Sequence, residues 1–107
     1  MRVLFDNGTP RGVASALAEH TVEEARAHGW DMFRNGELLD AAEAAGFDVF
    51  ITTDKNLRYQ QNLAGRHLAI LVLPTTSWPR IQAHLPEVVA AVAELVPGEL
   101  RELTFPA

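Results

Sequence analysis

The stretch "NGELLDAAEAAGFDVFITTDKNL" (residues 35–57) joins two periodicities, and together they indicate the class of fold. Its first half predicts a helix, with Asn35 as the N-cap and Gly46 at the C-terminal stop. One face of that helix carries the small or apolar residues Leu38, Ala41, Ala42 and Ala45. Its second half, "DVFITT", is a nearly continuous apolar run, which is typical of a parallel strand covered on both faces. A helix followed by a buried strand is the repeating unit of α/β folds.

The same alternation extends toward the N-terminus. Residues 2–5, "RVLF", form a short apolar run that predicts a first strand. Thr9–Pro10 then supplies an N-cap and a first helical residue, so a helix is expected over about residues 10–19. Residues 20–25, "HTVEEA", predict a weaker second strand, and residues 28–36, "HGWDMFRNG", predict a loop.

Toward the C-terminus the pattern continues in the same order. Residues 68–73, "LAILVL", predict another buried strand, with a short helix between it and the preceding one. Pro86 opens a final helix that Pro97–Gly98 ends, and residues 99–105, "ELRELTF", predict an edge strand. The sequence therefore predicts one domain over residues 1–107, an α/β three-layer α/β/α sandwich with a mostly parallel central sheet.

Composition excludes several classes of function. A hydrophobic content of 48% is that of a globular protein, and the absence of cysteine excludes a disulfide framework and a thiolate site. The net charge of −5 argues against a broad basic surface for gripping DNA, although an acidic metal site would itself contribute negative charge. No signal peptide or membrane-spanning run is apparent, so a cytoplasmic protein without membrane contact is expected.

Two of the predicted strands end in an aspartate, Asp6 after "VLF" and Asp54 after "FITT". The carboxyl ends of strands in an open α/β sheet are where ligands bind. Two carboxylates placed there repel one another, and a hard divalent cation is the common remedy. Glu37 lies in the first turn of the helix that precedes Asp54. A short connection would put that helix end at the amino edge of the sheet, whereas the long segment before it also allows the carboxyl edge.

Each acid also has a structural interpretation. Asp6 fits an Asx turn with Asn7–Gly8, Asp54 fits a cap of the turn that follows it, and Glu37 suits the dipole of a helix N-terminus. Taken singly, each acid is better explained in this way. The functional interpretation rests on the three acids occurring together.

Basic and aromatic residues lie close to these acids in the sequence. Lys55 and Arg58 are candidates for contact with a phosphate, and Tyr59 for stacking on a base, although a solvated polar helix explains them equally well. Trp30 and Phe33 are interpreted as cover for the core rather than as a stacking platform.

The segments "VLFDNGTP", "NGELLDAAEAAGFDVFITTDKNL" and "LAILVLP" resemble the short PIN-like domains, over residues 2–75. The resemblance implies a PIN-like fold related to metal-dependent ribonucleases, among them the toxins of toxin–antitoxin pairs. It also implies that Asp6, Glu37 and Asp54 bind Mg²⁺ or Mn²⁺, which activates a water for attack on an RNA phosphodiester.

This chain departs from the family pattern at two positions. Many relatives have acids where it has Asn7 and Asn56. An amide oxygen still coordinates a cation but carries no charge, so the three acids suit a single metal site better than a tight two-metal site, and the number of metals stays open. We expect Asn7 and Asn56 to contribute to substrate binding together with Lys55 and Arg58.

Three hypotheses about function follow. The first is a Mg²⁺- or Mn²⁺-dependent endoribonuclease, with an antitoxin protein as a partner. The second is a catalytically weak or inactive PIN-like module that binds RNA or a protein. The third, a receiver-like phosphoacceptor, needs an early acidic pair and a lysine after "LAILVL", and the chain has neither. A homodimer is a further expectation, because the final helix is unusually rich in apolar residues: Val88, Val89, Val92, Leu95 and Val96.

Overall fold

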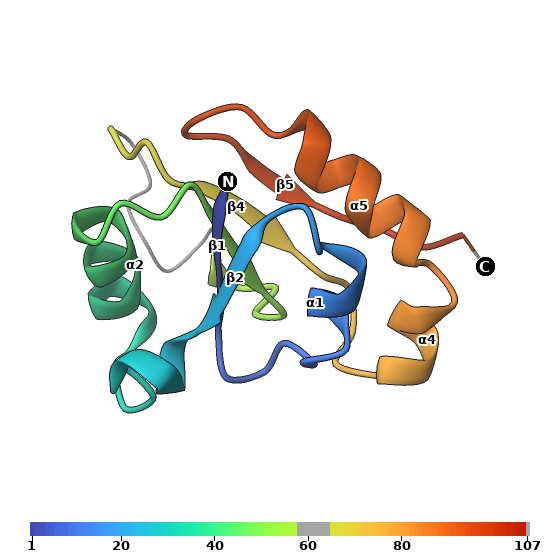
Figure 1. The fold of residues 1–107 in the computed structure, drawn as a ribbon, viewed down its shortest axis with the longest axis horizontal. Helices are drawn as coiled ribbons and strands as arrows, with labels where there is room; N and C mark the ends of the chain where they lie inside the picture. Colours follow the sequence, from blue (N-terminus) through green and yellow to red (C-terminus); the bar gives the residue numbers. More distant parts are fainter. Residues whose placement is uncertain (58–64, 107) are drawn as a thin grey trace.

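A computed structural model describes residues 1–57 and 65–106, apart from the side chain of Asn35, and shows one five-stranded sheet (Figure 1). The strands are β1 (Arg2–Phe5), β2 (Thr21–Glu24), β3 (Val49–Thr52), β4 (Ala69–Val72) and β5 (Leu100–Glu102). They are arranged in the order β2-β1-β3-β4-β5, and every neighbouring pair is parallel. The predicted parallel sheet is confirmed, including the weaker strand before Ala25 and the edge strand near the C-terminus.

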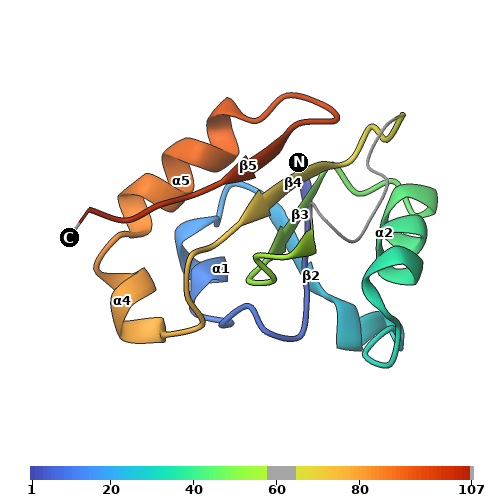
Figure 2. The same cartoon turned by 180° about the vertical axis from the view of Figure 1, so that it is seen from behind.

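Helical segments cover both faces of the sheet. They are α1 (Val13–Ala16), the 3₁₀ helix η1 (Ala25–His28), α2 (Asn35–Ala44), α4 (Trp78–Gln82) and α5 (Leu85–Glu94). Figures 1 and 2 show α1, α4 and α5 on one side of the sheet and α2 on the other. The two faces carry separate hydrophobic clusters, so the chain has a mixed α/β fold with a core on each side of the sheet.

The central strands owe their continuous apolar runs to this double cover. All four residues of β3 and all four of β4 are buried. Successive side chains of a strand point to opposite faces. Ile51 therefore packs on the side of α1 and α5, whereas its neighbour Phe50 packs on the side of α2.

Several helix boundaries differ from those predicted. The first helix spans only Val13–Ala16 rather than residues 10–19, and α4 was not predicted as a separate helix. Proline accounts for the division of the last helical region, since Pro79 and Pro86 each suit the first turn of a new helix. The short helix predicted between β3 and β4 falls mainly on residues 58–64, outside the described residues.

Helix α2 begins at Asn35, the residue that was predicted to be its N-cap. Its N-cap is Arg34 rather than Asn35, and the backbone N–H of Arg34 donates to Glu37 Oε1 at 3.4 Å. The predicted stop is confirmed at Gly46, whose φ of 83° lies in the left-handed region that favours glycine.

The direction of α2 decides where Glu37 lies. At the other end of the helix the Arg2 guanidinium donates to the carbonyl of Ala45, and the Asp48 N–H donates to the carbonyl of Arg2 at 2.9 Å. The C-terminus of α2 therefore lies beside the start of β1, which we call the amino edge of the sheet. Its N-terminus, with Glu37, lies toward the opposite, carboxyl edge (Figure 1). The simple expectation of the amino edge is wrong, because a helix between two parallel strands runs antiparallel to both.

The apolar residues in and just after the final helix, α5, are divided between the core and the surface. Val88 and Val92 are buried in the core, whereas Val89 and Val96 are 38% and 58% exposed. The homodimer stays a prediction. The longest described helices have ten residues, and no helix within residues 1–57 and 65–106 is long and apolar enough to cross a membrane.

Candidate functional site

The carboxylate of Asp6 is hydrogen-bonded at the end of β1. Its Oδ1 accepts from the Gly8 N–H at 3.1 Å and lies 2.7 Å from the hydroxyl of Thr9. Its Oδ2 accepts from the hydroxyl of Thr52, at the end of β3. Donors from two strand ends therefore fix the orientation of this carboxylate.

Thr52 connects the two acidic strand ends. Its side chain is fully buried, and its hydroxyl donates to Asp6 Oδ2 while it accepts from the backbone N–H of Asp54 at 3.1 Å. One hydroxyl thus joins Asp6 to the backbone of Asp54. Thr52 was not among the residues predicted for the site, and its one signal in the sequence is that it is the polar residue at the end of an otherwise apolar strand.

The turn after β1 lies directly against the end of β3. A Cβ added at Gly8 would lie 2.8 Å from the Thr53 hydroxyl, which is closer than real side chains approach. The Thr9 hydroxyl is also within 3.0 Å of the Ile51 carbonyl. Because the two segments approach so closely, position 8 favours a residue without a side chain.

Asp54 is half-buried and begins the next turn. Its Oδ1 accepts from the Asn56 N–H at 2.9 Å, and its carbonyl accepts from the Leu57 N–H at 3.3 Å. The capping role expected of Asp54 is therefore confirmed, as is the Asx turn expected at Asp6. These bonds orient both carboxylates.

Glu37 lies at the same edge but is exposed to solvent. Its carboxylate accepts from the Arg34 N–H within its own helix turn. Within the described ranges of the chain, no group of three or more His, Cys, Asp or Glu side chains is arranged to hold a metal ion. The structure thus links Asp6 with Asp54 through Thr52, and it does not bring Glu37 into a three-acid group with them.

The four predicted substrate contacts have different outcomes. Asn7 is exposed, and its Nδ2 donates to the carbonyl of Asp31 at 2.9 Å. Asn56 is exposed. Lys55 is exposed and lines a cavity of about 180 Å³ between the ends of β3, β4 and β5. Arg58 and the neighbouring Tyr59 lie outside the described residues.

Basic side chains are distributed unevenly between ion pairs and open surface. Four arginines each form an ion pair with a carboxylate at 3.3 Å or less: Arg2, Arg11, Arg66 and Arg101. Three exposed basic residues have no carboxylate within 4.0 Å in the part of the chain that the structure describes: Arg34, Lys55 and Arg80. All three follow the carboxyl ends of strands, so this edge offers positive charge to an anion.

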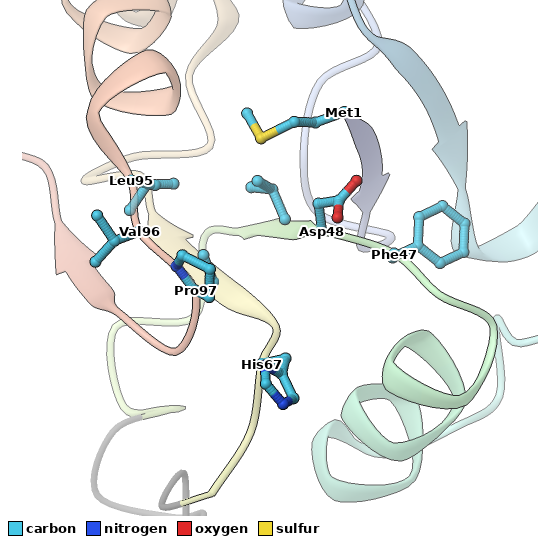
Figure 3. Close-up of a pocket in the computed structure, with 9 residues that line it drawn as sticks. Met1, Phe47, Asp48, His67, Leu95, Val96 and Pro97 are labelled. Atoms are coloured by element: carbon cyan, nitrogen blue, oxygen red, sulfur yellow. The ribbon is translucent and has the colours of Figure 1, made fainter.

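A larger cavity, of about 220 Å³, lies at the amino edge (Figure 3). Its lining is mostly apolar, from Met1 to Val96 and Pro97, with His67 and Asp48 as its polar members. The Asp48 carboxylate already accepts from the Arg2 N–H at 2.8 Å. This cavity is the larger of the two, but Asp6 and Asp54 lie at the opposite edge, and their carboxylates are the groups that could bind a metal ion.

Comparisons with protein-family models, curated proteins and solved structures find no match to this chain. Its function is therefore argued from the geometry of the carboxyl edge. That edge combines two aspartates, of which Asp6 is joined through Thr52 to the backbone of Asp54, with exposed positive charge.

Proposed function

We propose that this chain is a PIN-like α/β/α domain that hydrolyses RNA phosphodiesters with the help of Mg²⁺ or Mn²⁺. The observation that carries the proposal is the Asp6–Thr52–Asp54 link. It joins β1 and β3, the neighbouring strands at which a sheet of order β2-β1-β3-β4-β5 changes its winding direction. Ligands of open α/β sheets bind outside the carboxyl ends of the strands at such a point.

The donor set fits a hard divalent cation. Mg²⁺ in proteins is commonly bound by one or two carboxylates, and its remaining ligands are waters and substrate phosphate oxygens. Asp6 and Asp54 supply two carboxylates, so a third acid in direct contact is not required. Bound there, the cation would supply Lewis-acid stabilisation of the phosphoryl oxygens and a more acidic water.

The chain's own residues would then hold the reactants in place. Thr52 and Thr9 keep the Asp6 carboxylate in one orientation, which favours repeated binding of a cation in one position. Glu37, at the N-terminus of α2 on the same edge, is the acid we assign to orienting the attacking water. Arg34, Lys55 and Arg80 attract the phosphate backbone locally, despite the net charge of −5.

A second candidate is a PIN-like module that binds RNA or a protein without cleaving RNA. The exposed position of Glu37 and the lack of a three-acid group among the described side chains favour it. Both candidates use the same edge of the sheet. They differ in whether RNA is cleaved there.

The test is an RNA cleavage assay over a Mg²⁺ or Mn²⁺ titration. We expect Asp6→Asn and Asp54→Asn each to lower the metal-dependent rate at least about 100-fold, because metal stabilisation contributes several kcal/mol. The matched control is Asp40→Asn, an acid of α2 whose carboxylate pairs with Arg66 at 2.7 Å. Cleavage equal in wild type and both aspartate variants would contradict the nuclease. Metal-independent RNA binding without cleavage would favour the binding module.

A further inference from the structure

The turn after η1 presents aromatic and apolar side chains at the carboxyl edge. The rings of Trp30 and Phe33 are nearly parallel, at 12°, with centroids 6.4 Å apart, and the Phe33 N–H donates to the Trp30 carbonyl at 3.0 Å. Trp30 packs against the α2-side core, as predicted, whereas Phe33 lies on the Trp30 ring and is 39% exposed. Met32 between them is 86% exposed. Met32 and Phe33 are adjacent, so together they form a contiguous apolar surface of the kind that marks a binding site.

Asn7 connects this turn to the acidic site. It follows Asp6 directly, and its Nδ2 donates to the carbonyl of Asp31, within the turn. An aspartate at position 7 would have no N–H to donate and would set a carboxylate against that carbonyl. This contact gives a physical reason for an amide where an acid was expected.

We propose that the turn at residues 30–34 presents Phe33, with Met32 beside it, as a stacking platform for the unpaired bases of single-stranded RNA. Trp30, stacked on His28 and Phe33, supports the platform from beneath. Asn7 holds the turn beside Asp6 as a positioning residue. The inference rests on the proposed function and names the form of RNA that the same edge takes. Single strands offer both base faces to aromatic rings and phosphates to basic residues, whereas a duplex hides its bases. Arg34 supplies a positive charge at the end of the platform, with no carboxylate within 4.0 Å among the described side chains.

The test measures RNA binding without cleavage. Fluorescence anisotropy in EDTA would follow a labelled single-stranded RNA of about 12 nucleotides, and the same strand annealed to its complement. We expect the single strand to bind more tightly and Phe33→Ala to raise its Kd about tenfold, as loss of one base–aromatic stack does. The matched control is Val89→Ala on α5, where Val89 is 38% exposed, and its Kd should equal that of wild type.

A double-mutant cycle tests the role of Asn7. We expect Asn7→Asp to weaken single-strand binding several-fold in the wild-type background and to have no further effect in the Phe33→Ala background. A purely structural role would lower the thermal midpoint and weaken binding equally in both backgrounds. Equal effects in both would therefore overturn the positioning role.

The outcomes separate this inference from the nuclease proposal. An unchanged Kd for Phe33→Ala, equal binding of duplex and single strand, or no RNA binding at all would overturn the platform, whatever the cleavage assay gives. An unchanged Kd would instead leave Met32 and Phe33 to a protein partner. Loss of binding on Phe33→Ala, together with no cleavage by any form of the protein, would support the platform and contradict the nuclease.

Discussion

The two edges of the sheet differ in how many of their basic side chains are paired with carboxylates. At the amino edge Arg2 and Arg66 each pair with a carboxylate, and the cavity there is mostly apolar. At the carboxyl edge Arg11 pairs with Glu24 at 2.8 Å. Three further basic side chains at that edge have no carboxylate within 4.0 Å among the described residues: Arg34, Lys55 and Arg80. Asp6 and Asp54, joined through Thr52, lie at the same edge. The comparison indicates which charges stabilise the fold and which remain available to bind an anionic ligand.

At the amino edge, Arg2 is the centre of a network of hydrogen-bond, ion-pair and ring contacts. The Arg2 guanidinium donates to the Ala45 carbonyl, lies 3.3 Å from the Glu23 carboxylate and stands 4.2 Å over the ring of Phe47. His28 Nε2 lies 2.7 Å from the other oxygen of Glu23. That contact with His28, followed by the one with Arg2, lowers the pKa of the Glu23 carboxyl. Each of these groups already has a structural partner.

The largest effect on stability is expected where the two acidic strand ends meet. Thr52→Val keeps the shape of a fully buried side chain but removes the donor to Asp6 and the acceptor of the Asp54 N–H. We expect the free energy of unfolding, from urea titration, to fall by about 1–3 kcal/mol. Thr21→Val, on the exposed start of β2, is the control and should change it by less than about 0.5 kcal/mol. A Thr52→Val protein as stable as wild type would show that the link contributes nothing.

The next-largest loss of stability is expected for Arg2, at the amino edge, without an effect on RNA binding. Arg2→Met keeps an unbranched side chain but loses the bond to Ala45, the ion pair and the contact with Phe47. Because the guanidinium is partly exposed, we expect a loss of about 1–2 kcal/mol of unfolding free energy and an unchanged Kd for RNA. A fall in RNA affinity at constant stability would show that the two edges are not separate in function.

A smaller effect is expected for Lys55 at the carboxyl edge, on RNA binding rather than on stability. Lys55→Gln removes an exposed charge at the carboxyl edge, and we expect it to leave the thermal midpoint unchanged. It should weaken RNA binding several-fold and lower the slope of log K against log salt concentration by about 0.7, the value for one phosphate contact of a single strand. Anisotropy titrations at several salt concentrations measure both. An unaltered slope would remove Lys55 from the phosphate contacts.

The smallest effect is a dependence on pH at the amino edge. Because folding lowers the pKa of Glu23, its contribution to stability is present above the ordinary value of 4.5 and is lost as the pH falls through the folded pKa. We expect wild type to be slightly more stable than Glu23→Gln at pH 7, and this difference to shrink as the pH falls below 4.5 and to vanish once the Glu23 carboxyl is protonated in the folded protein. Urea midpoints of both proteins across this range provide the test. A difference that persists in acid would contradict the assigned cause.

Much of this comparison could be anticipated from the sequence, because strand content and strand ends are local features. The runs around Phe50 and Ile70 predicted buried strands, and Asp6 and Asp54 were expected at one edge because parallel strands share a carboxyl edge. Thr52 could not be distinguished from an ordinary strand threonine, since its partner Asp6 lies 46 residues away.

The other features that the sequence did not predict also depend on the three-dimensional arrangement of the chain rather than on local sequence. Asn7 looked like a missing acid until its contact with Asp31, 24 residues away, gave it a separate role. Phe33 looked like cover for the core, because hydrophobicity alone does not tell whether a turn faces inward. The direction of α2, and with it the edge that carries Glu37, was settled by Arg2 binding the far end of that helix.

The most direct test of the central claim is Mn²⁺ binding measured by isothermal titration calorimetry, without RNA. The account predicts that wild type binds Mn²⁺, that Asp6→Asn and Asp54→Asn each weaken binding about tenfold or more, and that the amino-edge variant Asp48→Asn binds as wild type does. Circular dichroism would verify that all four proteins are folded. Equal Mn²⁺ affinity in wild type, Asp6→Asn and Asp54→Asn, or loss of binding only in Asp48→Asn, would contradict a metal site at the carboxyl edge.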